Sequence, residues 1–178
     1  MSETSPRHAD RRTHGLHRVL VRTGFTTEQA VYGVLLVAGL IVVASLHSTS
    51  SLQVLVTVVF TVVVFWLAHV YAGTVAHHGL DEGRDTGLRA SFRQALRASW
   101  GLLLSALIPC AILLLGTTQV VPDPVAEWAA LWSCVILLGI LGYVAFARRG
   151  AAMPVRLLGA VSTAGFGALM ALLKAIVH

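Results

Sequence analysis

The arginines of this 178-residue chain form three clusters separated by long apolar runs. Five precede the first run, four lie between the second and third, and three lie between the fourth and fifth: Arg7, Arg11, Arg12, Arg18 and Arg22; Arg84, Arg89, Arg93 and Arg97; and Arg148, Arg149 and Arg156. The connections at 47–51 and 117–127 carry no basic residue. Because Lys and Arg are enriched in cytoplasmic loops, the pattern predicts a chain that crosses a bilayer repeatedly and is oriented by its arginines.

The composition agrees with a lipid environment. Hydrophobic residues make up 56% of the chain and charged residues only 12%, whereas about a quarter of the residues of a soluble domain are charged. The net charge of +5 does not indicate nucleic acid binding, because the arginines flank apolar runs, where anionic lipid headgroups account for them. Twelve arginines against one lysine, with abundant Ala, Val, Leu and Gly, are typical of GC-rich codons and predict a bacterial inner membrane.

Residues 1–24 are polar and lack the apolar core of a signal peptide. We therefore expect a flexible basic cytoplasmic tail, followed by a single transmembrane domain over residues 25–178. The predicted spans cover residues 28–46, 52–76, 100–115, 125–146 and 155–177, each close to or above the length that a bilayer requires. Five crossings place the N-terminus in the cytoplasm and the C-terminus outside. In an alternative with four spans, the last run lies in the interface.

One basic residue departs from the charge pattern. Lys174 lies near the end of the last run, on the side that five crossings place outside. A lysine at such a position can extend its ammonium to the headgroups, an arrangement called snorkelling. We expect Lys174 to do so.

A short amphipathic helix is predicted over about 87–98. Leu88, Phe92, Leu96 and Trp100 recur every four residues beside a basic stripe of Arg89, Arg93 and Arg97. Such a helix suits the headgroup layer. The stripe is expected to contact anionic lipid, and the alternative is a docking surface for an acidic cytoplasmic partner. The fold class is thus an all-α bundle of five transmembrane helices plus this cytoplasmic helix.

No Asp, Glu, Lys or Arg lies in the middle of a predicted span, which disfavours proton-coupled pumps. The ionisable residue that remains inside a span is His69, which shares a helical face with Trp66 and His77 at about 100° per residue. Glu28 and Tyr32 lie at a comparable depth on the first span. These five residues are the candidate polar or proton site. Either His69 forms a hydrogen bond to a neighbouring helix, or it relays protons in an oligomeric channel.

Other chemistry has weaker support in the sequence. Within the predicted spans there is no acidic pair and no His-Glu metal motif at helical spacing, so an intramembrane hydrolase is disfavoured and no catalytic site is predicted. His77 and His78 point about 100° apart and lack a specified third ligand, and Cys110 and Cys134 are not in a ligand spacing. No cofactor or metal is therefore predicted. A haem or metal site through His69 or His77 remains an alternative.

Small residues form a ridge on the last span. Ala160, Ala164 and Ala168 recur every four residues, with Gly167 beside them. Small side chains let another helix approach closely. The ridge is expected to serve packing within the bundle, with formation of a homo-oligomer as the alternative.

Three stretches carry a family resemblance: 27–33 (TEQAVYG), 66–72 (WLAHVYA) and 172–178 (LLKAIVH). They resemble small, uncharacterised bacterial integral membrane proteins. The resemblance implies membrane location and no activity, cofactor or site. Together with the patterns above, it leads us to expect a non-enzymatic inner-membrane protein with an assembly or accessory role. The alternatives are a proton or small-ion channel and a haem or metal binder.

Overall fold

The computed structural model describes residues 28–48, 50–78 and 88–177. Within them, five helices are long and apolar enough to cross a membrane. The first helix covers Glu28–His47. It is followed by α2 (Ser51–His78), α3 (Leu88–Thr117), α4 (Asp123–Ala147) and α5 (Met153–Val177). The chain is therefore an all-α, multi-pass membrane protein, as predicted.

Four of the five predicted spans match the helix bounds to within two residues, and the third differs. The residues expected to form a separate interfacial helix, 87–98, begin α3 without a break. At about 1.5 Å per residue, the 30 residues of α3 extend about 45 Å, against about 30 Å for a hydrocarbon core. The first turns of α3 therefore reach beyond the core. Residues 96–100 contain neither a proline nor a pair of glycines. The helical hydrogen bonds therefore continue from the predicted interfacial segment into the predicted third span.

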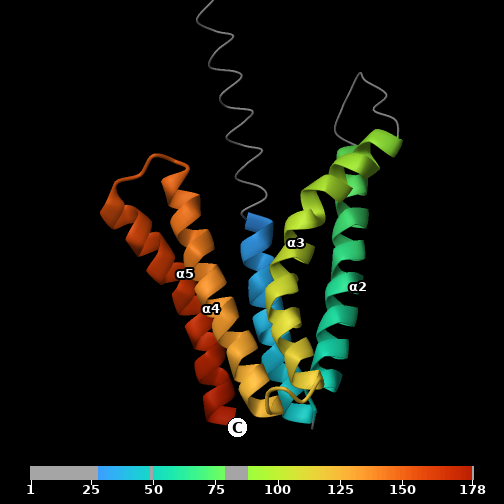
Figure 1. Cartoon of the computed structure of the whole chain (residues 1–178). Helices are drawn as coiled ribbons and strands as arrows, with labels where there is room; N and C mark the ends of the chain where they lie inside the picture. Colours follow the sequence, from blue (N-terminus) through green and yellow to red (C-terminus); the bar gives the residue numbers. More distant parts are fainter. Residues whose placement is uncertain (1–27, 49, 79–87, 178) are drawn as a thin grey trace, which may run out of the picture.

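Consecutive helices run in opposite directions, and the first helix lies between the α2–α3 pair and the α4–α5 pair (Figure 1). It is the most buried of the five. Its fully buried side chains include Val34, Val37, Ala38 and Ile41, which join Leu102 of α3 and Leu131 and Leu138 of α4 in one core cluster. In a membrane, such a core gains its stability from close packing, because lipid tails are as apolar as the side chains themselves.

Close approach of the helices depends on glycine at specific positions. A Cβ at Gly142 of α4 would lie 2.5 Å from the carbonyl oxygen of Gly159 and would overlap Thr163 Oγ1, both on α5. At Gly116, a Cβ would lie 2.6 Å from both Ala126 Cβ and Ser51 Oγ. These glycines allow backbones to meet where any side chain would hold them apart.

The two ends of the bundle differ in their polar groups. We call one end the arginine end, because it carries the exposed or partly exposed side chains of Arg89, Arg93, Arg97, Arg148, Arg149 and Arg156. The other is the Lys174 end, where α5 finishes and α4 begins. In Figure 1 the arginine end is uppermost, and the helix pairs lie farther apart there than at the Lys174 end. The predicted tail (1–24) and the acids of the 80–85 connection lie outside the described residues.

Candidate functional site

A buried ion pair joins α4 to α5 at the Lys174 end. Lys174 Nζ donates a hydrogen bond of 2.7 Å to Oε2 of Glu127. Lys174 is only 1% exposed and Glu127 only 7%. The ammonium also lies 5.5 Å from the ring centroid of Trp128, within the range of a cation–π interaction. The lysine is thus neutralised inside the bundle.

The prediction that Lys174 snorkels to the headgroups is therefore wrong. The sequence patterns place Glu127 near the start of the predicted span 125–146 and predict no partner for it. In the structure α4 begins at Asp123, so Glu127 stands one turn inside the helix and faces α5. Burial of an unpaired charge is costly, and a partner of opposite sign offsets much of that cost. The sequence contains one signal for this ion pair, because Glu127 and Lys174 each lie about one turn from a helix end.

A second polar contact at the Lys174 end joins α4 to α2. The Asp123 Oδ1 atom accepts a hydrogen bond of 3.1 Å from the backbone N–H of Ser51, and the Ser51 hydroxyl donates to the carbonyl oxygen of Asp123 at 3.4 Å. Ser51 is the first residue of α2, so the carboxylate meets the positive end of that helix dipole. Through Asp123 and Glu127, the first turns of α4 thus make polar contacts with both α2 and α5.

The predicted polar site around His69 is only partly brought together. His69 and Trp66 are both half-buried on the face of α2 that also carries the buried Val58 and Val62. Within the described residues, His69 has no hydrogen bond to another helix. Glu28 and Tyr32 of the first helix are exposed. The side chain of His77 lies outside the described part of the structure, so its role stays a prediction.

Two buried polar atoms in this half of the bundle have no hydrogen-bond partner in the described residues: Trp66 Nε1 and Gln29 Oε1. Gln29 belongs to the first turn of the first helix and is 7% exposed. A buried polar group without a partner costs roughly 1–3 kcal/mol. Within the described residues, these two atoms contrast with the charged pair at the Lys174 end, which is satisfied.

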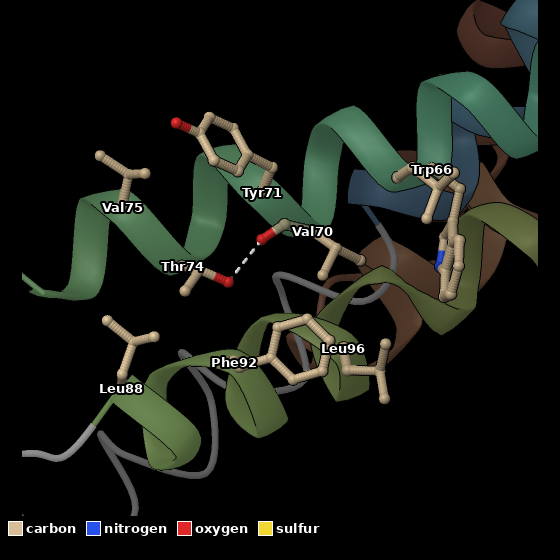
Figure 2. Close-up of a pocket in the computed structure, with 9 residues that line it drawn as sticks. Trp66, Val70, Tyr71, Thr74, Val75, Leu88, Phe92 and Leu96 are labelled. Carbon is tan, nitrogen blue, oxygen red and sulfur yellow. Dashed lines mark hydrogen bonds between the residues drawn. The ribbon is translucent and has the colours of Figure 1, made fainter.

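An apolar groove of about 330 Å³ lies between α2 and α3 at the arginine end (Figure 2). The α2 side is formed by Trp66, Leu67, Val70, Tyr71, Thr74 and Val75. The α3 side is formed by Leu88, Phe92 and Leu96. The predicted amphipathic segment thus turns its apolar row toward α2, while Arg89, Arg93 and Arg97 are exposed. His69 does not line the groove.

The small residues of α5 divide between two faces. Gly159, Gly167 and Ala171 are buried, and a Cβ at Gly167 would lie 3.0 Å from the Cα of Val135 on α4. Thr163 Oγ1 donates to the carbonyl oxygen of Leu138 on α4 at 2.9 Å. These residues face α4.

The ridge singled out from the sequence lies only partly on that face. Ala160 and Ala164 are half-buried, and Ala168 is exposed. On the exposed side, a Cβ at Gly165 would meet no atom within 4 Å. Four-residue spacing identified the small residues, but it could not show which of two neighbouring ridges faces α4.

Among the described residues, no group of three or more His, Cys, Asp or Glu side chains could hold a metal ion. Cys134 is buried, Cys110 is partly buried, and both are free thiols. The haem or metal alternative stays a prediction.

Comparison of the chain with protein-family models, with curated proteins and with solved structures gives no match.

Proposed function

We propose that this chain is a non-enzymatic protein of the bacterial inner membrane that works by helix-mediated assembly with a second copy of itself. The contact surface would be the exposed face of α5. The observation that carries the proposal is the open face around Gly165, where an added Cβ would meet no atom within 4 Å. In lipid, a glycine on an exposed helix face allows another helix to approach closely.

The packing of α5 supports this assignment. Of the five helices, α5 has the smallest buried share, 17% of its most apolar window. Ala168, one turn from Gly165, is exposed as well, so the exposed face combines small residues with large apolar ones such as Val161 and Leu172. This mixture offers both a close backbone approach and apolar side chains that pack beside it.

The orientation in the membrane is part of the proposal. Six arginines of the connections lie at or near one end of the bundle, and the connection at 117–127 contains none. By the positive-inside tendency, the arginine end faces the cytoplasm and the C-terminus lies outside. The dominance of arginine over lysine supports a bacterial origin through codon bias.

Energy transfer between labelled copies in proteoliposomes tests assembly. Copies carrying donor or acceptor dyes should show transfer above that expected from random proximity, and the transfer should fall on dilution with lipid. Gly165→Leu should weaken it, because the added side chain blocks the approach of backbones. Ala72→Leu, at an exposed position of α2, is the matched control and should leave it unchanged. Transfer at the random level in the unaltered protein would overturn the proposal.

A further inference from the structure

The groove between α2 and α3 is apolar even at its mouth, which lies near the end of α2 and the start of α3. Its deep end, at Trp66, is half-buried among core residues, whereas its mouth lies between Val75, near the end of α2, and Leu88, the first residue of α3. Tyr71, Val75, Leu88 and Phe92 are all at least half exposed. Because α2 and α3 are both longer than a hydrocarbon core requires, this mouth extends into the headgroup layer. An apolar surface there needs an apolar cover.

The polar groups that line the groove do not change its apolar nature. The Thr74 hydroxyl donates to the carbonyl oxygen of Val70 at 2.7 Å, so it is satisfied within α2. Figure 2 shows the Tyr71 hydroxyl pointing away from Leu88 and Phe92. The groove therefore offers contact area to a chain of methylene groups rather than hydrogen bonds to a polar ligand.

The α3 side of the groove is bordered by positive charge. Arg89, Arg93 and Arg97 each follow a groove residue directly in the sequence, and all three are exposed. Neither α2 nor α3 contains an Asp or Glu residue. A ligand held here would thus have an apolar part inside the groove and a negative charge at its mouth.

Size distinguishes the ligands that meet this description. One turn of an α-helix about 10 Å across and 5.4 Å long encloses roughly 400 Å³, more than the groove's volume of about 330 Å³. A single acyl chain is narrow and flexible. Anionic lipids also surround basic residues at the cytoplasmic surface of a membrane.

We propose that the α2–α3 groove holds one acyl chain of an anionic phospholipid, whose phosphate binds Arg89 and Arg93. The phosphate lies at the mouth, and the chain runs along Phe92 and Thr74 toward the indole of Trp66. This lipid site is separate from the α5 face, so either proposal can fail without the other.

Quenching of tryptophan fluorescence by brominated lipid tests the site, because Trp66 lies at its deep end. The protein is reconstituted in phosphatidylcholine vesicles in which the same mole fraction of either phosphatidylglycerol or phosphatidylcholine carries brominated chains. The difference between the unaltered protein and Trp66→Phe isolates the signal of Trp66. We expect quenching of this signal to show a preference for phosphatidylglycerol on the order of tenfold, because Arg89 and Arg93 attract the anionic headgroup.

Two sets of variants distinguish lipid binding in this groove from general attraction to the membrane surface. Replacing Arg89 and Arg93 together by Gln should abolish the preference, whereas replacing Arg148 and Arg149, at the same end of the bundle, should preserve it. Thr74→Leu, which fills the groove, should reduce quenching by both lipids. Equal quenching by the two lipids in the unaltered protein would overturn the proposal, and so would an equal loss of preference in the two arginine variants, which would indicate only general attraction to the surface.

Discussion

The ammonium of Lys174 and the carboxylate of Glu127 meet at 2.7 Å between two helices, one turn from the end of each. Both residues are almost completely buried, at 1% and 7% exposure. The pair joins the last helix to α4 with a directional contact, in a region where the remaining contacts between these helices are mostly apolar. Its geometry fixes the register of α5 along α4 at the Lys174 end.

Lys174→Met should destabilise the protein strongly, because it leaves the Glu127 carboxylate buried without its partner. Removal of one member of a buried pair costs about 3–5 kcal/mol. Thermal unfolding in detergent, followed by circular dichroism, should show a clear decrease in midpoint. Replacing Glu127 and Lys174 together by Met should recover most of the loss, since an apolar pair of similar volume is often neutral. A double variant as unstable as Lys174→Met would contradict this account.

The sequence was sufficient to predict the bounds of four of the five spans, because each depends on a run of about 20 apolar residues within one helix. The pairing of Lys174 with Glu127 depends on two residues 47 positions apart, whose helices meet only after the bundle has formed. The same holds for the Asp123–Ser51 contact, 72 positions apart. Periodicity indicates which residues share a face of one helix and leaves open which helix that face meets.

The same distinction applies to the groove, where periodicity identifies the apolar face of one helix but not the helix that this face meets. The four-residue repeat of Leu88, Phe92 and Leu96 predicted an apolar row correctly, but it assigned that row to the headgroup layer. In the structure this apolar row lies opposite Val70, Thr74 and Val75 of α2. The sequence signal for this juxtaposition is weak, because the connection between α2 and α3 is long enough to allow other placements of the row.

Gly142→Ala should loosen the contact between α4 and α5. The added Cβ would lie 2.5 Å from the carbonyl oxygen of Gly159, so one backbone must shift, at a cost of roughly 1–3 kcal/mol. Gly39→Ala, in the first helix, is the matched control, because it makes the same change in a helix where the Cβ meets no atom within 4 Å. Thermal unfolding in detergent should place Gly142→Ala below the unaltered protein and Gly39→Ala at or above it. Equal midpoints for the two variants would argue against the close contact.

Labelling of single cysteines should confirm the orientation in the membrane. In a background with Cys110 and Cys134 replaced by alanine, Val120→Cys should react with a membrane-impermeant maleimide in intact cells, and Ala152→Cys only after the membrane is opened. Both positions are exposed, Val120 at 76%. The physical reason is that arginines flank Ala152 and none lies near Val120. The reverse pattern would place the arginine end outside.

Reconstituted protein should not conduct protons through His69. Along its face of α2, Val58 and Val62 are almost completely buried, at 0% and 3% exposure, so the half-buried imidazole meets packed apolar side chains on the way toward the Lys174 end. A proton relay needs a continuous series of polar groups or water. In vesicles loaded with a pH-sensitive dye and given a potassium gradient with valinomycin, proton entry should equal that of protein-free vesicles, and His69→Ala should behave identically. A flux in the unaltered protein that His69→Ala abolishes would instead establish the channel alternative.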